Sequence, residues 1–204
     1  MNARQFAHDI IGFCRALGIE GAAFCGESFG ATLLLPLALE APELVAACIL
    51  TGGTHYFDEG IRTYLKQETP DNIDEGWRAI LQQAPHSVQG SDHWRRVVEA
   101  HAALGSHGHA QDFLETEELH QIGAPVLVVH GDSDSAHPVE DPLRLYRLLP
   151  DCELCVLPDT GHFPPDERPD WFNAIALDFL ARRYGEHPAT PSHIPDTPLI
   201  SGQS

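Results

Sequence analysis

The sequence predicts an α/β fold built on a parallel sheet, and three observations carry this prediction. A short apolar run at residues 22–25 ends in the pentapeptide G-E-S-F-G at residues 26–30. Two later apolar runs end in H-G-D-S-D at residues 130–134 and in T-G-H-F at residues 160–163. Helix-like segments separate these runs, and strands that alternate with helices are typical of a parallel sheet covered by helices.

The first element is a helix that precedes the pentapeptide. Phe6, Ile10, Phe13 and Leu17 recur at helical spacing, and Gly18 supplies the C-terminal stop. This helix leads directly into the strand that carries the pentapeptide.

A second helix and a buried strand follow. The helix runs from residue 31 to about residue 39 and is broken by Pro42. Residues 44–50 are almost continuously apolar, which suits a strand over residues 44–51 that is buried on both faces of a parallel sheet. Residues 1–51 are therefore expected to form the first part of the core.

Residues 52–123 change character and are expected to form a helical cap. Helical faces are visible in two segments, and no strand is convincing. These faces comprise Trp77, Ile80 and Leu81 in one segment and Trp94, Val97, Val98, His101 and Leu104 in the other.

The core resumes over residues 124–184. A strand is predicted at residues 126–129 and a helix at residues 138–149, with Leu143, Tyr146 and Leu149 turned inward. A final strand spans residues 152–157. The last helix begins at Pro169 and has its buried stripe at Phe172, Ile175, Ala176, Phe179 and Leu180.

Residues 185–204 are expected to be a disordered tail. This segment is rich in proline and has too few periodic apolar residues to offset the entropy lost on ordering it.

The composition excludes several classes of partner. The 204 residues include 30 acidic and 12 basic side chains, for a formal charge of −18, and 43% are hydrophobic. Such a charge repels phosphate backbones and anionic lipids, so we expect neither nucleic-acid nor membrane binding. No apolar run approaches the roughly 20 residues that span a bilayer, and residues 1–4 lead into an amphipathic helix instead of a signal peptide. A cytoplasmic location is expected.

The five cysteines are expected to be reduced. Cys14, Cys25 and Cys48 lie inside apolar patterns that suit packed thiols. Cys152 and Cys155 spell C-x-x-C, but residues three apart in a strand point to opposite faces, which separates the two thiols.

We expect no metal site and no cofactor. His107 and His109 lie two residues apart in a glycine-rich loop, and no third ligand follows at the spacing of a zinc site. We interpret these histidines as solvent-exposed.

Ser28 is the candidate nucleophile. A G-x-S-x-G turn between a strand and a helix projects the serine hydroxyl above the sheet, and small flanking residues avoid clashes at that turn. An alcohol is protonated at neutral pH and needs a base, for which His162 is the candidate. A carboxylate such as Asp134 would orient the histidine and stabilise its protonated form.

Taken together, these motifs resemble the α/β-hydrolase superfamily, most closely the small cap-bearing bacterial esterases, lactonases and carbon–carbon bond hydrolases. The resemblance covers about residues 3–183. It rests on the pentapeptide at residues 26–30, the segment 125–134, and G-H-F at residues 161–163 followed by E-R-P at residues 167–169. The order serine, acid, histidine is that of this superfamily and differs from the chymotrypsin and subtilisin orders.

The resemblance implies an α/β-hydrolase core, here the C-terminal half of the family's sheet, with an inserted helical cap. It also implies a serine hydrolase that acts on small, uncharged ester or related acyl substrates through an acyl-enzyme. The catalytic residues would be Ser28, Asp134 and His162, and the backbone N–H of Phe29 would be an oxyanion donor.

Asp132 and Asp58 compete with Asp134 for the acid role. The resemblance assigns the role to Asp134 and leaves Asp132 to brace the loop, with Asp58 as a remoter alternative. Glu27 either hydrogen-bonds to nearby backbone or faces solvent.

Four aromatic residues are candidates for the substrate pocket beneath the cap. They are Tyr56, Phe57, Trp77 and Trp94, and aromatic residues at helical spacing equally suit an ordinary core.

The chain begins at the helix before the elbow, where family members carry further strands and a loop that supplies a second oxyanion donor. The elbow strand is therefore expected at an open sheet edge, and a homo-oligomer is one way to cover it. A fragment of a longer protein and helices rearranged over the edge are the others. Loss of one oxyanion donor costs about 100- to 1,000-fold in rate, so the alternative function is that of a truncated or non-catalytic relative that binds a ligand or partner.

Overall fold

The computed structural model describes residues 2–83, 86–108 and 113–183. His109 and the tail predicted for residues 185–204 lie outside these ranges.

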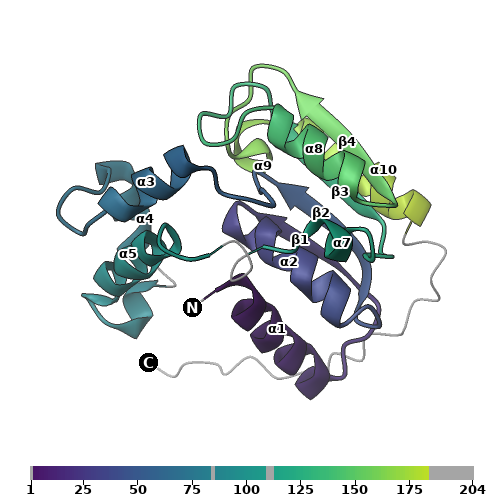
Figure 1. The fold of residues 1–204 in the computed structure, drawn as a ribbon, viewed down its shortest axis with the longest axis horizontal. Helices are drawn as coiled ribbons and strands as arrows, with labels where there is room; N and C mark the ends of the chain where they lie inside the picture. Colours follow the sequence, from purple (N-terminus) through teal and green to yellow (C-terminus); the bar gives the residue numbers. More distant parts are fainter. Residues whose placement is uncertain (1, 84–85, 109–112, 184–204) are drawn as a thin grey trace, which may run out of the picture.

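A parallel sheet of four strands forms the centre of the molecule (Figure 1). The strands are adjacent in chain order: β1 (Ala22–Glu27), β2 (Val45–Thr51), β3 (Val126–Gly131) and β4 (Cys152–Leu157). β2 and β3 are buried along their whole length, as the apolar run over residues 44–50 predicts. Because all pairings are parallel, the carboxyl ends of the strands meet at one end of the sheet.

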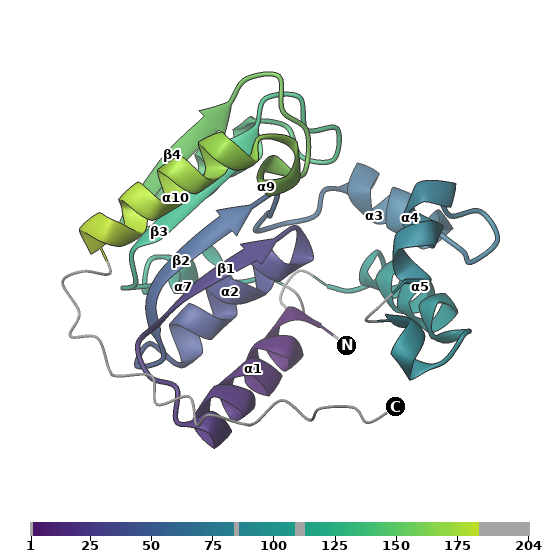
Figure 2. The same cartoon turned by 180° about the vertical axis from the view of Figure 1, so that it is seen from behind.

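Helices cover both faces of the sheet and bury it. One face carries α1 (Ala3–Leu17), α2 (Phe29–Glu40), α7 (Thr116–Leu119) and α8 (Glu140–Leu148) (Figure 1). The other face carries α10 (Pro169–Arg183), preceded by the single turn α9 (Pro164–Glu167) (Figure 2). The α/β fold with a parallel sheet is thus confirmed.

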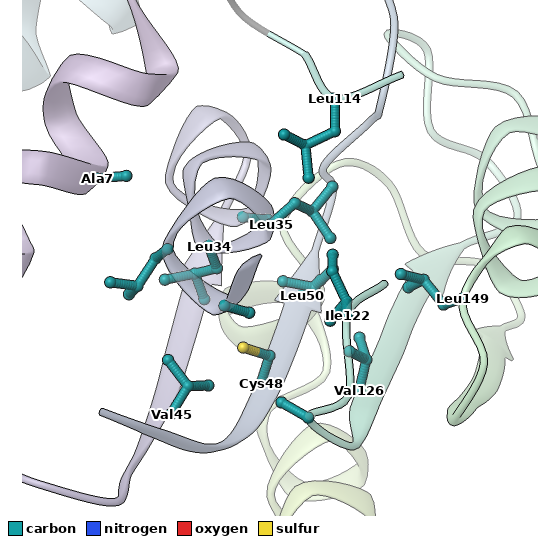
Figure 3. Close-up of a cluster of buried hydrophobic side chains, with 14 of the residues drawn as sticks. Ala7, Leu34, Leu35, Val45, Cys48, Leu50, Leu114, Ile122, Val126 and Leu149 are labelled. Atoms are coloured by element: carbon teal, nitrogen blue, oxygen red, sulfur yellow. The ribbon is translucent and has the colours of Figure 1, made fainter. Parts of the chain in front are cut away.

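The core consists of two apolar clusters, one on each face. The larger cluster joins α2, β2, β3 and α8, with Leu34, Leu50 and Leu149 among its members (Figure 3). The smaller cluster packs α10 against β2, β3 and β4. Cys152 packs against the larger cluster and Cys155 against the smaller one, so the two thiols point to opposite faces as predicted.

Between β2 and β3 the chain leaves the sheet and forms a separate group of helices (Figures 1 and 2). This helical group, residues 59–104, contains α3 (Glu59–Gln67), α4 (Glu75–Leu81), the 3-10 turn η1 (His86–Gln89) and α5 (His93–Leu104). It lies off the carboxyl ends of the strands and has a small apolar cluster of its own. Farther along, Leu114, Leu119 and Ile122 pack in the main core, although they fall inside the segment 52–123.

The helix α1 forms where predicted and ends at Gly18 in the left-handed conformation, but it buries a different face. Its buried residues are Ala3, Ala7, Ile11 and Cys14. Phe13 and Leu17 are more than 60% exposed. The alanines leave room for α1 to pack closely against α2, which turns the bulkier side chains away.

The helix α8 also differs in one residue. Leu149 is buried as predicted, but Leu145 lies beneath α8 and Tyr146 is 41% exposed.

The strand β1 has a neighbour on one side only within the described chain. Ser28 N donates to Thr51 O of β2 at 2.8 Å. Since alternate backbone groups of a strand point to opposite edges, the N–H groups of Cys25 and Glu27 point away from β2. The elbow strand is thus a sheet edge, as expected.

An apolar groove of about 450 Å³ follows this edge. Ile10 and Phe13 of α1, Phe24 of β1 and Leu33 of α2 line it. The predicted apolar face of α1 therefore borders the open edge of the sheet instead of the core.

No helix in the described ranges is long and apolar enough to cross a membrane. The same residues contain no group of three or more histidine, cysteine or acidic side chains arranged to hold a metal ion.

The open edge predicts self-association of the chain, because unpaired strand edges next to apolar surface template pairing. Light scattering coupled to size-exclusion chromatography should show a dimer or larger species that dissociates on dilution. Ala23→Lys should shift the population toward monomer, because Ala23 is exposed on β1 and charge on an edge strand opposes pairing.

The neutral change Ala23→Ser is the matched control and should leave the association unchanged. A monomer for the unmodified chain at every concentration would contradict this prediction.

Candidate active site

Ser28 lies on a sharp turn between β1 and α2, at the carboxyl end of the sheet. Its φ of 54° and ψ of −123° are rare for a residue with a side chain. Gly26 makes this turn possible, because a Cβ atom on Gly26 would overlap the carbonyl group of Gly30. Gly30 itself has no atom within 4 Å of where its Cβ would lie.

His162 comes from the loop between β4 and α9 and approaches the carboxyl end of β2. Gly52 follows β2 with a φ of 57°, and a Cβ there would overlap the His162 backbone. This glycine therefore lets the histidine loop pass close to the strand end.

Ser28, His162 and Asp134 form a continuous hydrogen-bonded chain. His162 Nε2 lies 3.0 Å from Ser28 Oγ, and His162 Nδ1 lies 2.8 Å from Asp134 Oδ2. Three residues separated by more than 130 positions in the sequence are thus brought into contact at the sheet end. The arrangement can transfer a proton from the serine hydroxyl to the imidazole while the carboxylate fixes the ring orientation.

Asp134 is held as a carboxylate. Its side chain is 1% exposed, and Oδ1 accepts hydrogen bonds from the backbone N–H groups of Ala136 and His137 at 2.8 and 3.0 Å. Burial alone would raise the pKa of Asp134, but the hydrogen bond from His162 and these two amides bring it below its ordinary value. The charged form that orients His162 is therefore favoured.

The two alternative acids lie elsewhere. Asp132 Oδ1 accepts from Ser133 Oγ at 2.9 Å and from Thr160 N at 3.4 Å, so it joins the acid loop to the histidine loop. Asp58 is exposed and caps α3 by accepting from Ile61 N at 2.7 Å.

Glu27 adjoins the nucleophile and has a buried carboxylate oxygen without a hydrogen-bond partner among the described residues. Burial and the charge of Asp166 raise its pKa, and the charge of His162 partly offsets this increase. Neither expectation for Glu27, backbone bonding or full solvation, describes this oxygen.

Phe29 is the first residue of α2, whose N-terminus adjoins Ser28. The first N–H groups of a helix have no acceptor within the helix and carry partial positive charge. The Phe29 amide is therefore positioned to interact with an anion that forms next to Ser28.

Two cavities adjoin Ser28 and His162. The first has a volume of about 510 Å³, and its apolar side chains include Phe29, Phe57 and Leu104. The second has a volume of about 620 Å³ and lies mainly against α3 and α4 of the helical group. Together they can hold a small molecule on both sides of the serine hydroxyl.

Of the four aromatic candidates, two line these cavities. Phe57 lines the first cavity and Trp77 lines the second. Trp94 is buried within the helical group against Leu81, and Tyr56 lines neither cavity.

Tyr56 instead belongs to a second network that sequence reasoning missed. It donates to Asp141 Oδ1 at 2.5 Å, and Asp141 Oδ2 lies 3.4 Å from His137 Nδ1. Burial alone would raise the pKa of Asp141, but the bonds from His137 and Tyr56 lower it. The His137 ring lines the first cavity with its centroid 5.7 Å from that of His162.

Sequence reasoning also missed the pairing of His101 with Glu68. His101 was noted only as part of an apolar helical face, and a polar ring on such a face is the signal that could have singled it out. Its Nδ1 lies 2.6 Å from Glu68 Oε2, and its ring lines both cavities.

Comparison with known proteins identifies the class. The chain matches the alpha/beta hydrolase family over residues 2–175 and belongs to that family. It is thus a hydrolase, and the resemblance drawn from the motifs is confirmed.

Relatives of known name agree. An uncharacterized hydrolase of Bacillus subtilis is 27% identical, with 87% of this chain and 71% of the relative covered. A 2-hydroxy-6-oxononadienedioate/2-hydroxy-6-oxononatrienedioate hydrolase of Comamonas testosteroni is 29% identical, with 86% and 68% covered.

Solved structures agree as well. A meta-cleavage product hydrolase from Pseudomonas fluorescens is 25% identical with a TM-score of 0.66, covering 89% of this chain and 73% of its own. A thermophilic esterase from Thermogutta terrifontis has the same fold, with a TM-score of 0.65 at 22% identity over 89% of this chain and 73% of its own.

The two glycines of the elbow should respond differently to alanine. Gly26→Ala should lower stability by about 2 kcal/mol and abolish activity, because the added methyl group overlaps backbone that cannot move aside. Gly30→Ala should leave the fold intact and raise stability by up to about 1 kcal/mol, because open space surrounds a helical position. Urea unfolding and ester hydrolysis measure both, and equal effects of the two changes would contradict this account of the turn.

Asp134→Asn should reduce ester hydrolysis by about 100-fold or more, since an amide cannot hold the required imidazole tautomer. Asp132→Asn is the matched control and should cost much less, because Asp132 contacts the loops and not His162. The reverse ranking would move the acid role to Asp132.

The stability effect of Asp134→Asn should depend on pH. A carboxyl group whose pKa falls on folding stabilises the fold above its unfolded pKa of about 3.9, and this contribution disappears as pH falls through the lower folded value. The difference in unfolding free energy between wild type and variant should therefore be larger at pH 7 than near pH 3.

Proposed function

We propose that this α/β hydrolase cleaves small ester or related acyl substrates through an acyl-enzyme on Ser28. The observation that carries the proposal is the chain of hydrogen bonds from Ser28 Oγ through His162 to Asp134. Its strained turn, its acid with a lowered pKa and the adjoining cavities are what such chemistry needs.

In the first half of the reaction, Ser28 Oγ attacks the acyl carbon as His162 Nε2 takes the serine proton. The tetrahedral oxyanion is stabilised by the Phe29 N–H at the start of α2. The bond to the alcohol oxygen then breaks, and His162 returns the proton to that oxygen, which leaves the acyl group on Ser28.

In the second half, water attacks the acyl-enzyme while His162 takes one of its protons. The bond between the acyl carbon and Ser28 Oγ breaks, the proton returns to Ser28, and the free acid leaves. Asp134 stabilises the imidazolium in both halves without taking its proton.

The helical group acts in this proposal as a cap over the site. Side chains from α3 and α5, among them Ile61, Leu65 and Leu104, line the first cavity together with Ser28. Apolar walls suit an uncharged acyl group, and no lysine or arginine lines either cavity among the described residues. The names of relatives include carbon–carbon bond hydrolysis as well as ester hydrolysis, and both use the same nucleophilic site in this proposal.

The competing function is a ligand- or partner-binding relative without catalysis. The observation that favours it is that the Phe29 amide is the oxyanion donor that the described chain offers next to Ser28. Loss of a second donor costs about 100- to 1,000-fold in rate, so residual activity must be measured with sensitive probes.

A fluorophosphonate probe should label the wild-type chain covalently, because only a base-activated serine attacks phosphorus readily. Ser28→Ala should abolish the label, and His162→Gln should slow it by at least about 100-fold.

Ser133→Ala is the matched control, since Ser133 contacts Asp132 and lies outside both cavities. Equal labelling of wild type and Ser28→Ala would refute the assignment of the nucleophile. Strong labelling without turnover of any ester would favour the binding function.

A further inference from the structure

Four residues are common to the two cavities and define the place where these cavities meet. They are Ser28 and His162 from the core and Tyr64 and His101 from the helical group. A substrate whose scissile bond lies at Ser28 extends into both cavities, so these four residues flank that bond. Tyr64 and His101 are therefore the side chains by which the helical group reaches the reacting part of a substrate.

His101 is held in place by Glu68. Glu68 caps the end of α3, and its Oε2 lies 2.6 Å from Nδ1 of His101 on α5. The hydroxyl of Tyr64 donates to the same carboxylate. The Glu68 side chain is 9% exposed, so water competes little for these bonds. The pairing also fixes α3 relative to α5.

The pairing determines what the imidazole offers to a ligand. An ionised carboxylate only accepts hydrogen bonds, so His101 Nδ1 donates to Glu68. In the neutral ring this leaves the lone pair on Nε2, for which the described chain provides no partner. His162 is arranged in the same way, with Nδ1 on Asp134 and Nε2 toward Ser28. The site therefore contains a second imidazole acceptor, supplied by the helical group.

The linings of the cavities indicate which part of a substrate meets this acceptor. The wall of the first cavity is built largely from apolar side chains such as Phe57, Ile61 and Leu65, which suit an acyl chain. The second cavity includes amide and carboxyl residues of the helical group, with Gln67 and Glu68 among them. The alcohol part of an ester would therefore occupy the second cavity, next to His101.

We propose that His101 is a substrate-contacting residue that accepts a hydrogen bond from a hydroxyl group on the alcohol part of the substrate. The inference rests on the ester hydrolysis proposed above and narrows its substrates to esters of short diols or other polyhydroxylated alcohols with an apolar acyl group. A hydroxyl that finds a preformed acceptor beside the scissile bond gains one hydrogen bond that an alkyl group of the same size lacks.

Hydrolysis of 2-hydroxyethyl butanoate and of propyl butanoate tests the proposal, because the two esters differ only by a terminal hydroxyl in place of a methyl group. Wild type should show kcat/KM about tenfold higher for the hydroxyethyl ester, the effect of about one hydrogen bond. His101→Leu should reduce this preference to about onefold, mainly through KM for the hydroxyethyl ester. Glu68→Gln should reduce it partly.

Two further variants separate contact with substrate from a structural role. His101→Asn keeps an acceptor oxygen and should retain part of the preference, which a packing defect would not do. His120→Leu makes the same change at an exposed histidine outside both cavities and should leave the preference at its wild-type value.

The results distinguish failure of this inference from failure of the proposed function. If Ser28-dependent hydrolysis of both esters occurs but wild type shows no preference, or His101→Leu keeps it, the role of His101 is wrong and the nucleophile assignment stands. If neither ester is hydrolysed, or Ser28→Ala remains active, the proposed function is wrong and this inference fails with it.

Discussion

The parallel pairing of the four strands is the constraint on which the site depends. It brings the carboxyl ends of β1, β3 and β4 to one end of the sheet, where each is followed by a loop that carries one functional residue. β2 lies between β1 and β3 and ends at Gly52, whose missing side chain lets His162 approach. Residues far apart in sequence are therefore positioned by rigid backbone and not by flexible loops alone.

The same arrangement explains why the site combines order with strain. Ser28 holds a rare backbone conformation between a strand and a helix that are both anchored in the core. Its N–H still bonds to β2, so the turn begins while the ladder of the sheet is intact. The energy needed for such a conformation, of order 1–3 kcal/mol, is supplied by the surrounding packing.

Much of the fold and the candidate site followed from the sequence because these features are local. The elbow, the acid loop and the histidine loop each lie next to an apolar run, and Ser28, Asp134 and His162 are recognised by motif and chain order. The buried face of α1 was not predictable in this way. Alanine contributes little to an apolar stripe, yet Ala3 and Ala7 are the residues that let α1 pack against α2.

Pairings between distant side chains were also beyond sequence reasoning. Tyr56 and Asp141 are 85 positions apart, and His101 and Glu68 are 33 positions apart. Nothing in the local pattern around either tyrosine or histidine reveals such a partner. Tyr56 was therefore expected in the substrate pocket, and only the folded chain shows that its hydroxyl is bonded to a buried carboxylate.

The account stands on the claim that Ser28 is activated by His162 and carries the acyl group during turnover. Mass spectrometry of the chain, quenched with acid during hydrolysis of 4-nitrophenyl butanoate and then digested, tests this most directly. The account predicts one butanoyl group on the peptide that contains Ser28, absent in Ser28→Ala and strongly reduced in His162→Gln. Turnover with no acyl group on that peptide, or acylation at the same level in His162→Gln, would contradict it.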